Sequence, residues 1–457
     1  MGIKDKQYKK MTETPVRRLI MSLSVPTIIS MLVTAIYNMA DTFFVGQLGK
    51  SASGAVGIVF SIMAIIQAIG FTLGMGSGTW ISRLLGRKDN QKASRVASTG
   101  IFMGLVLGIV ISVVGIVFID KILILCGATD TILPHAKNYA LYILLAAPIM
   151  ICSFILNNIL RSEGKARFSM IGITAGGVLN IALDPLFIYV FDLGTAGAAI
   201  ATAISQLVSV IILLIPFIIR KTETKLSVKR IELTALTPFH ILKNGFPSFC
   251  RQGLASLATI LLNTAASGYG DAAISAMSIT GKIFMMVFSV VIGLGQGYQP
   301  VLGYNYSAGF FKRVRTAAAF MLEASYVIVI VIGGALAIFS GELIGLFIND
   351  AEVVSIGATA LRLQCLGLAF VPVGILANMT LQSIGDSFKA SFLSSLRQGI
   401  FFIPLILILP KYIEILGVQI TQGAADVLTF FVSLPFYLVF LKKLPKEDKP
   451  INEEIKE

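Results

Sequence analysis

The sequence predicts an all-α polytopic membrane protein with twelve transmembrane helices in two pseudo-symmetric six-helix bundles. The chain has 457 residues, of which 56% are hydrophobic and only 13% charged, and its mean hydropathy is +0.85. Apolar runs long enough to cross a bilayer recur along the whole chain, and identical residues recur at one constant spacing. The composition and the runs exclude an ordinary soluble protein, and the spacing divides the chain into two similar halves.

Twelve apolar segments are each long enough to span the hydrocarbon core, which needs about 20 helical residues. The predicted helices lie near residues 17–44, 54–81, 96–119, 138–160, 168–191, 195–219, 243–267, 274–302, 316–340, 357–381, 388–410 and 416–441. The connectors between them are too short to hold a soluble catalytic domain. One membrane unit therefore accounts for the whole sequence.

Basic residues gather at alternate helix ends. They stand in clusters at residues 4–18, 83–92, 161–167, 220–230, 312–315, 389 and 442–446. The connectors on the other side carry acidic residues and few basic ones. This pattern follows the positive-inside rule, so we expect a multi-pass protein of the cell membrane with both termini in the cytoplasm. It also explains the net charge of +13 without a nucleic-acid partner.

The two halves of the chain repeat each other at one constant offset in residue number. Six pairs of identical residues share it, because the two numbers of each pair differ by 221: Pro26 with Pro247, Gly74 with Gly295, Gly76 with Gly297, Asn157 with Asn378, Ser162 with Ser383, and Gly164 with Gly385. We therefore expect a first lobe over residues 1–218, a cytoplasmic linker over 219–242, a second lobe over 243–441 and a cytoplasmic tail over 442–457.

Each half holds six spans, so both halves enter the membrane in the same direction. This parallel-repeat arrangement is typical of secondary transporters with a central cavity and alternating access. No nucleotide-binding G-x-x-x-x-G-K-[ST] sequence occurs, because Gly164-Lys165 is followed by Ala166. An ion gradient must then supply the energy. Aspartate-rich, histidine–glutamate and serine-nucleophile motifs are also missing, so we expect neither an enzyme nor a cofactor.

Four oxygen-bearing side chains in the first half predict a cation site. Asp41 and Asp184 lie inside apolar spans, roughly 8 and 12 Å below the outer boundary by the helical rise per residue. Asn180 is one helical turn from Asp184, and Thr202 reaches a similar depth. A carboxylate in hydrocarbon is costly unless it is paired, hydrated or bound to a cation. These residues suit either a Na⁺ cage or a carboxylate pair that shares a proton.

Two further readings of the polar residues stay open. Asp41 could be a boundary residue, and Asp184 could hydrogen-bond to Asn180 only as structural glue. At the repeat-related positions, the second half has no side-chain oxygen, so any cation site of this kind is one-sided. Its main membrane-level carboxylate is expected to be Glu323, for which pairing with a basic neighbour and a substrate role are equally open.

Polar and adaptable side chains within the spans are candidates for lining a substrate cavity. Met and aromatic side chains re-pack around varied ligands, and basic and amide groups could either line the cavity or pair with each other. The candidates are Tyr37, Asn157, Arg251, Gln252, Met286 and Gln296.

Four motifs together resemble the multidrug and toxic compound extrusion (MATE) family over residues 15–440. They are Tyr37-Asn38-Met39-Ala40-Asp41-Thr42, Arg83-Leu84-Leu85-Gly86, Arg161-Ser162-Glu163-Gly164 and Asn180-Ile181-Ala182-Leu183-Asp184-Pro185. The resemblance implies a V-shaped pair of six-helix bundles that exports cationic, amphipathic compounds in exchange for Na⁺ or H⁺. It also implies that Asp41, Asn180, Asp184 and Thr202 form the cation site.

The leading interpretation is therefore a secondary active multidrug exporter. Its partners would be small-molecule drugs, a coupling cation and membrane lipid, and we expect a monomer. A flippase for lipid-linked glycans is the alternative. It would need a strongly basic cavity, for which Arg251, Lys282 and Arg397 are candidates. A membrane-embedded enzyme is the least favoured reading.

Overall fold

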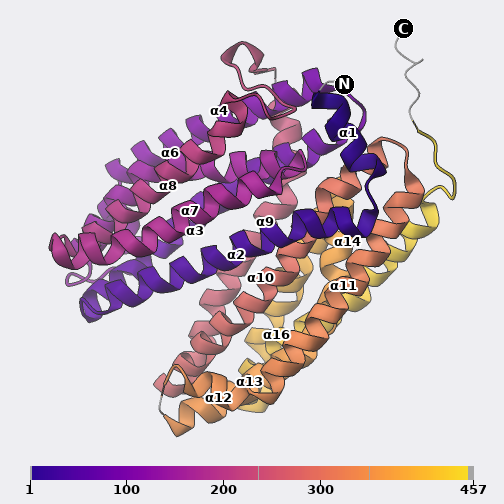
Figure 1. Ribbon diagram of the computed structural model, residues 1–457. Helices are drawn as coiled ribbons and strands as arrows, with labels where there is room; N and C mark the ends of the chain where they lie inside the picture. The colour runs from indigo at the N-terminus through magenta and orange to yellow at the C-terminus, as the bar shows by residue number, and fades with distance from the viewer. Residues whose placement is uncertain (1–2, 235, 349, 451–457) are drawn as a thin grey trace. The chain divides into compact units, whose positions relative to one another are not determined.

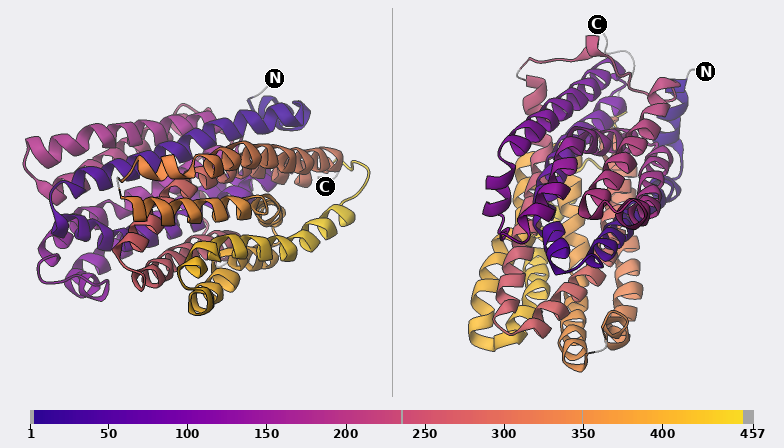
Figure 2. Two further views of the ribbon diagram at one scale, coloured as in Figure 1. Left: turned by 90° about the horizontal axis from the view of Figure 1, so that it is seen from below. Right: turned by 90° about the vertical axis from the view of Figure 1, so that its left-hand side faces the viewer.

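The computed structural model describes residues 3–234, 236–348 and 350–450, and the regular structure of these residues is entirely helical (Figures 1 and 2). The helices of the first half and of the connector are α1 (Ile3–Glu13), α2 (Val16–Gly46), α3 (Lys50–Gly86), α4 (Asn90–Val117), α5 (Ile119–Leu125), α6 (Leu133–Ser162), α7 (Ala166–Pro185), the π-helical turn η1 (Leu186–Val190), α8 (Gly194–Ile218) and the short 3₁₀ turn η2 (Val228–Arg230).

The elements of the second half follow a similar but not identical order. They are α9 (Leu236–Ser267), α10 (Asp271–Ser307), α11 (Phe311–Ile338), α12 (Ser340–Gly345), α13 (Ala351–Leu368), α14 (Val371–Ile384), α15 (Ser387–Ser395), the π-helical turn η3 (Leu396–Phe401) and α16 (Phe402–Lys443).

The helix boundaries confirm the repeat and its offset. Helix α10 begins and ends 221 residues after α3, since 271 − 50 and 307 − 86 both equal 221. Helices α4 and α11 do the same, since 311 − 90 and 338 − 117 equal 221. Gly49 and Gly270 precede α3 and α10 with φ angles of 113° and 91°. Glycine adopts this conformation without steric cost, so each half makes the same tight turn into its second long helix.

All twelve predicted spans fall on helices. Among the described residues, ten helices are long and apolar enough to cross a membrane. The span predicted at 357–381 is made of α13 and α14, which are interrupted at Ala369 and Phe370. The last two spans are joined in α16 across a kink at Ile413 and Glu414, where Glu414 has a φ of 52°. The α9 helix, which carries Lys243 and Arg251, is not among the ten.

The helices pack into two compact units that exchange short segments. The first unit contains Met1–Thr14 and Val25–Phe249, and the second contains Pro15–Ser24 and Cys250–Glu457. Within the first unit α6 packs against α3, α4 and α8, and within the second α10 packs against α11, α13 and α14 (Figure 1). The start of α9 therefore belongs to the first unit, and the start of α2 belongs to the second.

Glycines make these exchanged contacts possible. A Cβ atom added to Gly76 of α3 would lie 2.0 Å from the Ile241 carbonyl oxygen of α9, and one added to Gly245 would lie 1.9 Å from the Thr72 carbonyl oxygen. In the second unit, a Cβ atom on Gly297 of α10 would lie 2.5 Å from the Ser24 backbone nitrogen of α2. Small residues let membrane helices approach backbone to backbone, and the repeat uses this device in both units.

The connector after α8 is fixed by the buried carboxylate of Glu163, which follows α6. This carboxylate accepts hydrogen bonds from the backbone N–H groups of Glu223, at 2.7 Å, and Thr224, at 3.0 Å, and from the Thr224 hydroxyl. Lys165 pairs with it at 3.4 Å. Burial raises the pKa of Glu163, although these partners oppose the shift. One side chain thus holds the connector against the turn between α6 and α7.

We expect Glu163→Ala to release the connector, because two buried backbone donors would lose their acceptor at about 1–3 kcal/mol each. In membrane vesicles oriented so that added trypsin reaches the connector, cleavage at the exposed Lys225 and Lys229 should become faster. The exposed Glu13→Ala serves as the matched control and should leave cleavage unchanged. Equal cleavage rates in the two variants would show that Glu163 does not hold this segment.

Candidate cation site

Three of the four predicted cation ligands meet between α7 and α8. Asn180 donates hydrogen bonds from its Nδ2 atom to Asp184 Oδ1, at 3.1 Å, and to Thr202 Oγ1, at 3.3 Å. The exposed fractions of Asn180, Asp184 and Thr202 are 2%, 0% and 4%. Asn180 and Asp184 share a helix face because they are four residues apart. Pro185 follows and lacks an N–H, so the Ile181 carbonyl loses its usual helical donor at this level.

Asp41 belongs to the same polar cluster. It lies on α2, is 8% exposed, and accepts a hydrogen bond of 3.0 Å from the hydroxyl of Tyr139 on α6. It is close enough to Asp184 for the two carboxylate charges to interact. Four helices, α2, α6, α7 and α8, therefore contribute to one buried acidic cluster.

Several oxygens of this cluster are buried without a hydrogen-bond donor. Asp41 Oδ1, Asn180 Oδ1 and Asp184 Oδ2 each lack a partner in the described part of the chain. A buried oxygen without a partner is costly, and such atoms require an explanation. Carboxylate and amide oxygens are the donors that Na⁺ and other hard cations prefer, and a carboxylate oxygen can equally take a proton. The chemistry of the cluster therefore fits a small cation.

A small cavity adjoins the cluster. Its volume is about 30 Å³, enough for a water molecule. Tyr37, Asn180 and Thr202 line it, as does Ser205, whose hydroxyl is also buried without a partner. The other lining residues are Thr34, Ser153, Phe154, Ile173, Gly176, Gly177, Gln206 and Ser209.

The remaining predicted substrate residues are placed differently. In the first unit, Asn157 accepts a hydrogen bond of 2.9 Å from Ser169 Oγ and does not line this cavity. In the second unit, Arg251 donates to Asn378 Oδ1 at 3.3 Å. Gln296 is 2% exposed on α10, whereas Gln252 and Met286 are half-buried.

Two functional candidates did not emerge from the sequence. Tyr139 stands in the first turn of the predicted fourth span, at the outer side where Asp41 also lies, and this shared depth was the available signal. Glu323 takes the first of its two expected roles, because it is 59% exposed and pairs with the basic Arg17 at 3.2 Å. The buried carboxylate of the second unit is Asp426, the one acidic residue within the predicted span 416–441.

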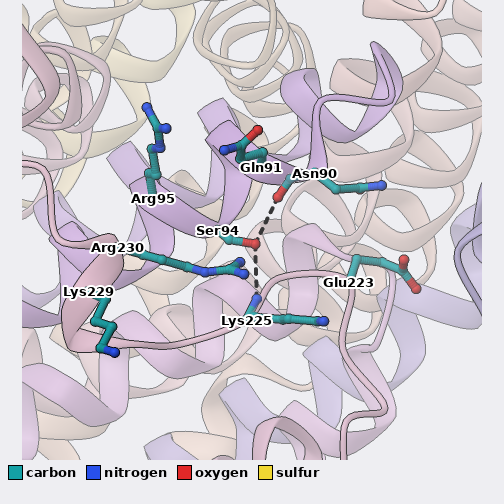
Figure 3. A pocket seen from close by; sticks show the side chains of 8 residues that line it. All are labelled: Asn90, Gln91, Ser94, Arg95, Glu223, Lys225, Lys229 and Arg230. Carbon is teal, nitrogen blue, oxygen red and sulfur yellow. Dashed lines mark hydrogen bonds between the residues drawn. The ribbon is translucent and has the colours of Figure 1, made fainter.

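A second cavity has a different character. Its volume is about 310 Å³, and it lies between the first turns of α4 and the connector (Figure 3). Ser94 fixes one wall, since its hydroxyl accepts from the Lys225 backbone N–H at 3.0 Å and donates to the Asn90 carbonyl at 2.8 Å. The lining residues are Asn90, Gln91, Ser94, Arg95, Glu223, Lys225, Lys229 and Arg230. None of the predicted cation or substrate residues is among them.

A family model described as MatE matches residues 26–186 and 247–408, which together make up more than half of the chain. The two matches begin at the offset of the repeat, since 247 − 26 equals 221. The multidrug export protein MepA of Staphylococcus saprophyticus is 31% identical over 423 residues, which cover 91% of this chain and 92% of that protein. MepA of Staphylococcus aureus strain MSSA476 is 30% identical over 419 residues, with the same coverage.

Solved structures agree with this relationship. A multidrug resistance MATE family transporter of the MOP superfamily, solved in an outward-facing conformation, has a TM-score of 0.90 and 27% identity, with 96% of this chain and 99% of that chain covered. A MOP superfamily transporter from Pyrococcus furiosus has a TM-score of 0.90 and 26% identity, with 97% and 99% covered. The chain belongs to the multidrug and toxic compound extrusion (MATE) family, and it is a multi-pass membrane transporter and not an enzyme.

Proposed function

We propose that this transporter exports amphipathic, cationic drugs by alternating access, in antiport with Na⁺ or H⁺. The name of the MepA relatives, multidrug export protein, supports the substrate class. The observation that carries the coupling is the buried cluster of Asp41, Asn180, Asp184 and Thr202, whose three unpartnered oxygens can receive a cation. The coupling ion is cargo of the exchange, and we propose no resident cofactor.

The mechanism follows from the cost of a buried charge. Two carboxylates in an apolar bundle repel each other, and one of them must be neutralised before the site can close away from water. A Na⁺ ion or a proton that bridges Asp41 and Asp184 links α2 to α7. This link favours one position or bend of α2, whose interior Pro26 weakens the helix. Ion binding then shifts the balance between the two access states. Drug affinity changes to the extent that these two states make different contacts with the drug.

We propose that Tyr37, Asn157, Arg251, Gln252, Met286 and Gln296 line the drug cavity. Tyr37 links this cavity to the cation cluster, because it lines the small cavity beside Asn180 and Thr202. We also propose that the protein works as a monomer, with both termini in the cytoplasm.

Export from vesicles with independently imposed Na⁺ and H⁺ gradients tests this function. We expect ethidium transport to respond to one of the two gradients and to stop when that gradient is collapsed. Transport that ignores both gradients would refute cation coupling. Transport of lipid-linked glycan without ethidium movement would favour the flippase.

The structure gives the flippase little support. Of its three candidate basic residues, Arg397 is neutralised by Asp426 at 2.6 Å and Arg251 is hydrogen-bonded to Asn378, and only Lys282 is exposed. A pyrophosphate head needs cations that are free to bind it.

Tyr139→Phe should weaken ion coupling without removing it. The change deletes the hydroxyl that donates to Asp41 and leaves a second unpartnered carboxylate oxygen on that residue. Losing a hydrogen bond to a charged group costs about 1.5–3 kcal/mol, so the coupling-ion concentration for half-maximal transport should rise roughly 10- to 150-fold. Tyr142→Phe, on the same helix, is the control. Identical ion dependence in both variants would remove Tyr139 from the site.

A further inference from the structure

The second unit contains a buried ion pair between η3 and α16. Arg397 donates from Nε to Asp426 Oδ1 at 2.6 Å and from Nη2 to Oδ2 at 3.3 Å. The side chain of Asp426 is 0% exposed and that of Arg397 is 15% exposed. The guanidinium also covers the Phe288 ring, 4.2 Å from its centroid, and approaches Phe284 at 5.7 Å. Bidentate pairing and stacking together hold the arginine in one position.

The repeat places this pair where the first half has its small cavity. Subtracting 221 takes Arg397 to Gly176 and Asp426 to Ser205, and both of these residues line that cavity. The two positions are neighbours in the first half as well, since a Cβ atom on Gly176 would lie 3.0 Å from the Ser205 carbonyl oxygen. The equivalent place therefore holds a small cavity between α7 and α8 in the first half and an ion pair between η3 and α16 in the second half.

The hydrogen bonding of the two places differs accordingly. In the first half, the Ser205 hydroxyl and Asn180 Oδ1 are buried without partners among the residues that the structure describes. In the second half, both oxygens of Asp426 accept from Arg397, and Gln422 adds a third hydrogen bond at 3.1 Å. In the first half these oxygens are available to a bound cation, whereas in the second half the chain itself supplies the cation, Arg397.

We propose that Arg397 is a tethered cation that permanently fills the second half's counterpart of the small cavity beside the cation site and thereby confines exchangeable-ion binding to the first half. Asp426 is then a carboxylate that binds a cation, and that cation is the guanidinium of Arg397. The π-helical turn that contains Arg397 supports this assignment, because such turns redirect a side chain relative to a regular helix and often stand at functional sites. The consequence for transport rests on the proposed function, whereas the occupancy of Asp426 does not.

The test converts the tethered cation into a free one. Arg397→Ala leaves a guanidinium-shaped space beside Asp426, Phe288 and Gln422. Purified Arg397→Ala should gain thermal stability from millimolar methylguanidinium, with a midpoint several degrees higher, and gain little from methylurea, which has a similar shape but no charge. In Arg397→Ala/Asp426→Asn, the apparent affinity for methylguanidinium should fall about tenfold or more. Arg362→Ala, which removes an arginine bonded to the Ser340 hydroxyl, should gain no such stabilisation.

Each result decides the proposal. Stabilisation that requires both the positive charge and Asp426 supports it, including the case in which Arg397→Ala folds only with methylguanidinium present. A folded Arg397→Ala that binds no cation through Asp426 overturns it. An Arg397→Ala that stays unfolded with methylguanidinium present overturns it too, because the freed carboxylate should accept that ion. These measurements read binding without a gradient, so failure of the export assay would leave their outcome unaffected.

Discussion

Asp184→Asn is expected to reduce gradient-driven drug export strongly while the protein still folds. The amide has the shape of the carboxylate and can keep the hydrogen bond from Asn180, but it can neither bind Na⁺ by charge nor take up a proton. The site is then fixed in a neutralised form, and ion binding no longer changes the balance between the two access states. Export should fall by roughly 5–150-fold, the range of typical coupling free energies.

Ethidium efflux from cells and from vesicles with an imposed gradient measures this loss. Asp192→Asn is the matched control, since Asp192 is exposed and only eight residues away. Its φ of 52° is one that Asn tolerates, so the control makes the same chemical change without strain. Unchanged efflux in Asp184→Asn, with normal amounts of protein in the membrane, would disprove the proposed role of the acidic cluster.

Gly76→Ala is expected to prevent the first unit from packing. The new methyl group would lie 2.0 Å from the Ile241 carbonyl oxygen and 2.9 Å from the Gly245 nitrogen, so the two helix backbones must separate. Backbone atoms cannot move aside as a flexible side chain can, and the cost should reach about 3 kcal/mol or more. We expect little folded protein after detergent extraction, or a sharply lowered unfolding temperature.

Gly57→Ala on the same helix is the control for Gly76→Ala. Gly57 is exposed, and a Cβ atom there would have nothing within 4 Å. Alanine favours a helix over glycine by roughly 0.5–1 kcal/mol, so this variant should be as stable as the parent or slightly more stable. Similar behaviour of the two alanine variants would show that α3 and α9 do not approach as closely as described.

Much of the fold was predictable because the bilayer imposes simple rules. Span length and the repeat both follow from patterns that need no tertiary contacts. Asp41, Asn180, Asp184 and Thr202 were chosen because polar residues inside spans are rare, and the structure gathers them into one cluster. Their role in transport remains a proposal.

The parts that escaped prediction depend on long-range contacts. Tyr139 meets Asp41 across 98 residues of sequence, and nothing local marks a buried tyrosine as a hydrogen-bond donor. Asp426 and Arg397 are 29 residues apart on different helices, so their pairing is invisible to periodicity. For Glu323, the sequence left ion pairing and a substrate role equally open, because depth along a helix does not show which way a side chain faces.

The segments exchanged between the two units also constrain the order in which the protein can be made. The surface of α3 around Gly76 is covered by residues 236–249, which leave the ribosome only after the first six spans and the connector. The first unit therefore stays incomplete until translation has entered the second half. If the chain is divided within the connector, each fragment should fold poorly when it is expressed alone. Each fragment should fold better when the other is expressed in the same cell.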